Sequence, residues 1–134
     1  MPTLSIEESR DLQLQFEKRG GLLPAIVQET ESKEILMLGY VNREAFEETL
    51  RSGYATFGST SRQELWTKGK TSGDYLKLRK ILVDCDQDSL IYQVEMLGGG
   101  ACHTKDEHGE TRKSCFYRGF RYRGNDKGQE LEFE

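Results

Sequence analysis

The sequence has no apolar run long enough to cross a membrane, and its first twenty residues lack the apolar stretch of a signal peptide. Basic charge is not in excess either, because 19 Lys and Arg residues against 23 Asp and Glu residues give a net charge of −4. Binding to a nucleic-acid backbone needs a basic field, so this composition argues against that class. We therefore expect a cytosolic protein that binds neither membranes nor nucleic acids. Local donors could still bind a small anionic substrate.

Cysteine is scarce, and the three residues Cys85, Cys102 and Cys115 are an odd number. An odd count in a cytosolic chain argues against a disulfide framework. No C-x-x-C pair is present, and the H-x-E with P-C-x-x-C signature of zinc deaminases is absent. Two interpretations remain: three buried thiols, or three ligands that would leave a bound zinc with an open fourth position.

The pattern of apolar residues predicts an α+β fold with a mostly antiparallel sheet and short helices, in a single domain over residues 1–134. A capping box at Ser5 and Glu8 predicts a helix to about Lys18, with Leu12 and Phe16 on one face. A second helix is expected over 43–51, with an Asn42 N-cap and with Phe46 and Leu50 facing inward. Strands are expected at 22–28, 35–41, 54–57, 75–86 (with a bulge near Arg79), 90–96 and 115–122. The acidic tail from about residue 124 is expected to be partly disordered.

The segment Asp84-Cys85-Asp86-Gln87-Asp88 carries a dense group of metal-ligating side chains. In an extended chain side chains alternate, so the three carboxylates would share one face and Cys85 would point to the other. Oxygen ligands suit magnesium, whereas a thiolate suits zinc. The alternative is a polar turn at a strand end, where Asp is common. A calcium loop of the EF-hand type fits poorly, because Ser89 stands where that loop needs glycine.

A second group of candidates lies in the segment 66–73, which combines cations, hydroxyls and glycines. Backbone N–H groups of such loops can bind phosphate, although the P-loop pattern is absent and a plain hairpin loop is the alternative. Arg62 precedes this segment. His103, beside Cys102, is a candidate general acid or base near a metal-bound water, or else a surface residue. His108 lies in a charged stretch and is interpreted as solvated.

Taken in order, these segments resemble the phosphoribosyl-AMP cyclohydrolase family over roughly residues 22–118. The matching pieces are Pro24-Ala25-Ile26-Val27-Gln28, Leu36-Met37-Leu38 with Tyr40, Asn42-Arg43-Glu44-Ala45, Ser59, Ser61-Arg62, Leu65-Trp66 with Lys68-Gly69, Ser72-Gly73, the Asp84 to Asp88 cluster, Cys102-His103-Thr104 and Ser114-Cys115-Phe116-Tyr117-Arg118. The resemblance implies zinc bound by Cys85, Cys102 and Cys115, and magnesium bound by Asp84, Asp86 and Asp88. It also implies a homodimer whose zinc ligands come from both subunits.

The resemblance further implies an enzyme of histidine biosynthesis whose substrate is an AMP with a second phosphoribosyl group on N1. Zinc-activated water would attack C6 and open the N1–C6 bond, with His103 as the residue that moves protons. The candidates for substrate binding are Arg62, Trp66, Lys68, Gly69, Ser72 and Gly73, and for Trp66 we favour a core position over stacking on the base. The alternatives are a structural zinc module that holds a dimer together and another metal-dependent nucleotide hydrolase.

One departure from the family pattern concerns the segment between Cys102 and Cys115. It is longer here by about half a dozen residues, which costs little closure entropy, so the ligands can still converge. The role of this insertion, residues 105–112, does not follow from the sequence.

Overall fold

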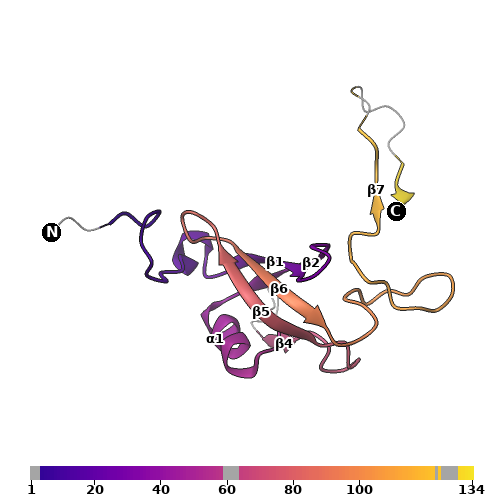
Figure 1. Ribbon diagram of the computed structural model, residues 1–134, viewed down its shortest axis with the longest axis horizontal. Coiled ribbons are helices and arrows are strands. Elements are labelled where there is room, and N and C mark those ends of the chain that lie inside the picture. The colour runs from indigo at the N-terminus through magenta and orange to yellow at the C-terminus, as the bar shows by residue number, and fades with distance from the viewer. Residues whose placement is uncertain (1–3, 59–63, 123, 125–129) are drawn as a thin grey trace.

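The computed structural model describes residues 4–58, 64–122, 124 and 130–134, and its centre is a four-stranded sheet (Figure 1). The strand order is β2-β1-β6-β5, with β1 at Leu23–Glu29, β2 at Ile35–Val41, β5 at Leu76–Val83 and β6 at Leu90–Met96. The pairs β1–β2 and β5–β6 are antiparallel hairpins, and the two central strands β1 and β6 run parallel. The expected α+β fold with a mostly antiparallel sheet, in a single domain, is confirmed for the described residues.

Alternation of side chains explains the sheet. In β1, Leu23, Ala25 and Val27 are fully buried, while the residues between them face the other side. The expected strands at 22–28, 35–41 and 90–96 are confirmed, and 75–86 contains β5. The expected bulge is confirmed too, because the register of β5 against β6 shifts between Leu78 and Lys80.

One face of the sheet is covered by the helix α1 (Arg43–Ser52) and by the hairpin of β3 (Thr56–Gly58) and β4 (Leu65–Thr67). The Asn42 side chain accepts the N–H of Ala45 at 2.8 Å, which confirms the expected cap. Phe57 of β3 lies so close to Gly39 that a Cβ there would be 2.4 Å from the phenylalanine ring, so this approach requires glycine. No described helix is long and apolar enough to span a membrane.

The inward orientation expected for Leu50 is wrong. Phe46 is buried as expected, but Leu50 is 54% exposed. The buried residues of α1 are Ala45, Phe46 and Thr49, with Thr49 hydrogen-bonded to Thr56 of β3 and Phe46 packed against Phe16, and Leu50 is not among them.

The expected helix from Ser5 to Lys18 is also wrong. Ser5 closes a single turn with Glu8 and Ser9, and the only helical element before β1 in the described part is the 3-10 helix η1, Phe16–Arg19. The segment between them is held instead by Gln87, whose side-chain oxygen accepts the N–H of Gln13 at 2.6 Å and whose backbone oxygen accepts the N–H of Gln15 at 2.8 Å. These distant contacts override the local capping signal, and Leu12 stays 59% exposed.

The strand expected at 115–122 is wrong except for β7, Arg118–Gly119, which pairs with β8, Glu132–Phe133. Cys115 donates its N–H to Leu36 of β2 at 2.7 Å, and the chain then leaves the sheet. β7 and β8 form an arm that projects away from the body (Figure 1). Of the tail expected to be partly disordered, residues 125–129 lie outside the described residues, and residues 132–133 are ordered in β8.

Candidate active site and metal centre

A hollow of about 590 Å³ opens beside β4 and the turn that follows it. Its lining includes five of the residues predicted to bind substrate or move protons, namely Trp66, Lys68, Gly69, Ser72 and His103. Gly73 belongs to the same turn without lining the hollow, and Arg62 lies outside the described residues. A second hollow of about 760 Å³ lies between the insertion and the C-terminal arm and holds none of the residues predicted to react with substrate.

The turn after β4 gets its shape from glycine. Gly69 has φ +93°, and a Cβ there would lie 2.4 Å from the backbone of Asp74 and Tyr75, so a side chain is excluded both by conformation and by space. The N–H of Gly73 donates to the carbonyl of Gly69 at 2.7 Å and closes the turn. The result is a compact loop that carries Lys68 and Ser72 on the edge of the hollow.

Trp66 is 41% exposed and lies at the wall of the hollow. Its ring centroid is 4.8 Å from that of buried Phe57, so one part of the indole packs on the core while another part stays open. The interpretation of Trp66 as a core residue is therefore wrong: the ring packs against the core and also lines the hollow.

His103 follows Cys102 directly and is exposed on the hollow. Lys68, Lys70 and Glu48 line the same hollow. The ammonium groups of the two lysines and the hydroxyl of Ser72 make the hollow suited to an anionic ligand. His108, interpreted as solvated, has a side chain 77% exposed at the tip of the insertion.

Two of the three predicted zinc ligands lie together next to this hollow. The thiols of Cys102 and Cys115 are within hydrogen-bonding reach of each other, and the Lys68 ammonium acts on Cys115. Cys115 is exposed as a whole residue, but desolvation of its sulfur, together with the neighbouring Cys102, raises its pKa to about 11. The pair would therefore lose protons one after the other, and a bound cation would favour loss of both.

Thr104 orients the buried Cys102 thiol. Its hydroxyl lies 2.9 Å from the sulfur and its N–H donates to the sulfur at 3.4 Å. Burial disfavours the thiolate, but the contacts with Thr104, together with those from Cys115 and the charge of Arg112, outweigh it and lower the pKa of Cys102. Arg112 donates in turn to the Thr104 hydroxyl at 3.2 Å, and its guanidinium lies 4.1 Å from the centre of the Tyr117 ring.

Cys85 does not join this pair within one chain. It lies in the turn before β6, whereas Cys102 follows the other end of that strand. β6 has 7 residues, and at about 3.3 Å per residue such a strand spans roughly 20 Å. A zinc ion held by all three thiols thus needs Cys85 from a second chain.

The carboxylates of Asp84, Asp86 and Asp88 gather within 4.8 Å of one another. They do so in a turn, however, and not in the extended chain from which their common face was predicted. Asp84 accepts the N–H of Asp88 at 2.9 Å and that of Ser89 at 3.1 Å, and Gln87 takes the left-handed conformation with φ +57°. The polar turn that was weighed as the alternative therefore exists, and it also gathers the carboxylates.

Two cations from η1 pair with two of these three carboxylates. Lys18 Nζ lies 2.8 Å from Asp86 and 2.9 Å from Asp88, and Arg19 lies 3.0 Å from Asp88. The hydrogen bonds to Asp86 and Asp88 raise the pKa of Lys18. Asp88 is only 2% exposed, and its hydrogen bond with Lys18 holds its pKa well below the usual range. The carboxylates suit a hard cation, but such an ion would have to displace the Lys18 ammonium.

Sequence reasoning missed several residues that take part in these arrangements. Lys18 and Arg19 reach the acidic turn from almost seventy residues away, and no local pattern signals that pairing. Thr104 precedes the insertion and Arg112 is its last residue, and their link to the Cys102 thiol depends on how the loop closes. Lys70 lies in the segment 66–73 that the sequence predicts as a phosphate-binding loop. Its positive charge in that glycine-rich segment was the signal that could have identified it as a candidate.

A family model described as phosphoribosyl-AMP cyclohydrolase matches residues 37–117 of the chain. Among curated relatives, the phosphoribosyl-AMP cyclohydrolase of Desulfatibacillum aliphaticivorans is 52% identical over 107 residues, which is 80% of this chain and 81% of the relative. The proteins of the same name from Streptococcus gordonii (50% identical, 80% of this chain and 88% of the relative) and Clostridium botulinum (43% identical, 86% and 98%) are also similar. The chain therefore belongs to the phosphoribosyl-AMP cyclohydrolase family.

Proposed function

We propose that the protein is a phosphoribosyl-AMP cyclohydrolase of histidine biosynthesis. It hydrolyses the N1–C6 bond of an adenine ring whose N1 carries a second phosphoribosyl group. One observation carries the proposal: in a chain about half identical to enzymes of that name, a single hollow is lined by a cationic glycine-rich turn and by His103, the residue that follows Cys102. The cytosolic location expected from the sequence stays a prediction.

The substrate is already activated by its substitution. An alkyl group on N1 places positive charge on the ring, and C6 becomes an electrophile for water. The water oxygen bonds to C6, the N1–C6 bond breaks, and N1 takes up a proton while C6 becomes a carboxamide carbon. His103, exposed on the hollow, is the group we assign to carry that proton from the water to N1.

The cationic turn is assigned to the phosphates. Lys68, Lys70 and Ser72 line the hollow, and the turn around Gly69 that carries them is closed by the Gly73–Gly69 hydrogen bond. Ammonium and hydroxyl groups donate to phosphate oxygens, and burial of the ligand strengthens these bonds. Trp66 forms a flat wall against which the base can lie. Gly73 shapes the turn, and Arg62 remains a further candidate.

The metal assignments are part of the proposal. Thiolates of Cys85, Cys102 and Cys115 would hold zinc, which when bound lowers the pKa of water and so supplies the nucleophile. The contacts between Cys102, Cys115 and Thr104 support this, because they favour the deprotonated form of Cys102 that a metal requires. Since Cys85 lies at the far end of β6, the enzyme would be a homodimer with shared zinc sites. Asp84, Asp86 and Asp88 would hold magnesium only if it displaces Lys18.

The test is turnover of two nucleotides, phosphoribosyl-AMP and AMP itself, by the folded, zinc-loaded protein. We expect ring opening of phosphoribosyl-AMP alone, because the positive charge from the N1 substituent makes C6 a much stronger electrophile than it is in AMP. The reaction is followed by the change in ultraviolet absorbance as the purine ring opens. Folded protein with a full zinc complement that opens neither nucleotide would contradict the proposed function.

A further inference from the structure

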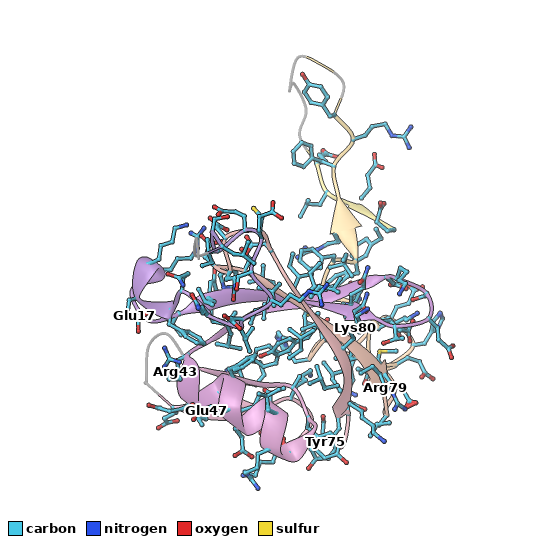
Figure 2. The ribbon with its side chains drawn as sticks, turned by 60° about the vertical axis from the view of Figure 1, so that its left-hand side comes forward. Glu17, Arg43, Glu47, Tyr75, Arg79 and Lys80 are labelled. Atoms are coloured by element: carbon cyan, nitrogen blue, oxygen red, sulfur yellow. The ribbon has the colours of Figure 1, made fainter. Side chains whose placement is uncertain are left out.

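The C-terminal arm of β7 and β8 contributes no described residue to the lining of the proposed substrate hollow. The family model ends at residue 117, and the arm begins with β7 at Arg118. Figure 2 shows the arm standing clear of the sheet, on the opposite side from α1. The arm nevertheless meets the insertion, because the second hollow, of about 760 Å³, is lined by residues of both, among them Arg112 and Phe133.

Aromatic rings hold the Arg112 side chain at this meeting point. The guanidinium carbon lies 4.1 Å from the centre of the Tyr117 ring and 5.6 Å from that of the Phe133 ring. The two rings stack, with centroids 6.0 Å apart and planes inclined by 22°. A guanidinium at such distances is attracted by the negative face of a ring. Arg112 is in no ion pair among the described residues, so these rings are the partners of its charge.

The strand β8 brings Phe133 to this place. Phe133 pairs with Arg118 in the ladder of β7 and β8, and the N–H of Glu134 donates to the carbonyl of Tyr117 at 3.0 Å. Phe133 is 70% exposed, so its side chain lies outside the core. A side chain this exposed contributes little to the packing of the body, and its effect is expected to be confined to the groups that it contacts.

On its other side Arg112 is bound to the loop that carries Cys102. Its Nη1 donates to the Thr104 hydroxyl at 3.2 Å, and its backbone carbonyl accepts the N–H of Cys102 at 3.1 Å. A Cβ at Gly100 would lie 2.4 Å from that carbonyl oxygen, so this close approach of the two backbones requires glycine. The Thr104 hydroxyl, 2.9 Å from the Cys102 sulfur, completes a continuous series of contacts from the arm to the thiol.

We propose that the C-terminal arm is a positioning element of the zinc site, and that Phe133 is the residue through which it acts. Phe133 and Tyr117 keep the Arg112 guanidinium in the orientation that donates to Thr104, and the Thr104 hydroxyl then stays turned toward the sulfur. An arginine side chain has many rotamers, so a contact that selects one of them reduces the entropy lost when the hydrogen bond forms. The inference rests on the proposed function in one respect, which is that Cys102 binds zinc.

The experiment is a double-mutant cycle of Phe133→Ala and Arg112→Met, with zinc affinity measured by competition with a zinc-binding dye. Phe120→Ala is the matched control, because Phe120 lies in the same arm, is 55% exposed and makes no ring or cation contact among the described residues. Phe133→Tyr tests rescue, since tyrosine keeps the ring. The absorption of the cobalt(II)-substituted proteins reports on the thiolate ligands directly, and circular dichroism checks the fold.

We expect Phe133→Ala to weaken zinc binding about 2- to 5-fold, which is what the loss of one exposed cation–π contact permits. Phe120→Ala and Phe133→Tyr should bind zinc as the wild type does. Arg112→Met should weaken binding about 10-fold, and Phe133→Ala should have no further effect in that background, because the ring acts only through the guanidinium. The thiolate-to-cobalt absorption should change in Phe133→Ala and stay unchanged in Phe120→Ala.

Two results would overturn this role of the arm. One is a folded Phe133→Ala protein whose zinc affinity and cobalt spectrum equal those of Phe120→Ala. The other is an equal effect of Phe133→Ala with and without Arg112, since the ring would then act by another route. If the wild type turns over phosphoribosyl-AMP in either case, the proposed function stands and only the role of the arm fails. A zinc affinity that depends on Phe133 through Arg112, in a protein that turns over no substrate, supports the positioning role and rejects the function.

Discussion

At the scale of single residues, short hydrogen bonds position the Cys102 sulfur. The Thr104 hydroxyl accepts from Arg112 at 3.2 Å and faces the sulfur at 2.9 Å, so one hydroxyl links a guanidinium to a thiol. Partners of this kind fix a metal ligand's orientation and its charge. The guanidinium of Arg112 lies over the Tyr117 ring. Because Arg112 is the last residue of the insertion, this end of the insertion has a structural role next to the proposed zinc centre.

We predict that Thr104→Val weakens zinc binding about 10- to 100-fold, because the side chain can no longer donate to the sulfur. The control is Thr111→Val, since Thr111 lies in the same loop and its hydroxyl contacts only Lys105 among the described residues. Competition with a zinc-binding dye measures both affinities. Equal affinities in the two variants would show that the Thr104 hydroxyl does not support the ligand.

His103 offers a second prediction at this scale. His103→Asn should lower kcat by roughly 100- to 10,000-fold, the usual contribution of a positioned acid or base, while zinc stays bound. His108→Asn is the matched control, because that imidazole is 77% exposed at the insertion tip. Steady-state turnover with zinc analysis separates the two. Full activity of zinc-loaded His103→Asn would remove this residue from the mechanism.

At the scale of elements, the N-terminal segment is fixed by the turn between β5 and β6. Gln87 binds the backbone at Gln13 and Gln15, and Lys18 of η1 places its ammonium between Asp86 and Asp88. The central strands could be predicted because each carries its own alternation of buried and open positions. The N-terminal helix could not be excluded from sequence, because its competitor is a contact with residues about seventy positions away. The carboxylate cluster was predicted, but from a strand instead of the turn that forms it.

We predict that Lys18→Met lowers the free energy of unfolding, and that the difference from wild type depends on pH in a defined way. The ordinary pKa of Asp88 is 3.8 and the folded value lies below it, so its stabilising contribution is complete above pH 3.8 and is lost as the pH falls further. Lys18 has an ordinary pKa of 10.5 and a higher folded value, so its contribution is complete below pH 10.5. The difference should therefore be constant near neutral pH and shrink in acid.

Urea titrations of wild type and variant at several pH values between about 2 and 8 measure this difference. Lys33→Met is the control, because Lys33 is exposed and forms no ion pair within the described residues. A difference that persists unchanged at the lowest pH where the proteins fold would mean that the Lys18 ion pairs do not carry the effect.

At the scale of the whole molecule, the proposed zinc site is divided between the two ends of the sheet. Cys102 and Cys115 lie near the hollow with His103 and Lys68, and Cys85 lies beyond the other end of β6. The sequence identified all three cysteines as candidates. It could not show how they are distributed, because that depends on the direction of β6 and on where the chain returns to β2.

Subunit complementation tests this division. Cys85→Ser and Cys102→Ser proteins should each be inactive, but mixing them after dissociation should recover about one quarter of wild-type activity, because half of the dimers are mixed and each has one intact site. Mixing Cys102→Ser with Cys115→Ser is the control and should recover nothing, since both ligands belong to the same end. Recovery in the control, or none in the test mixture despite exchange of subunits, would contradict shared sites.

The most direct test of the account is turnover of phosphoribosyl-AMP before zinc removal, after removal by a chelator, and after zinc is added back. Zinc content and circular dichroism are measured at each step, so that loss of metal is distinguished from loss of fold. We predict that activity disappears with the zinc while the chain stays folded, and returns when zinc is restored. Undiminished turnover by folded protein that contains no zinc would contradict the central claim.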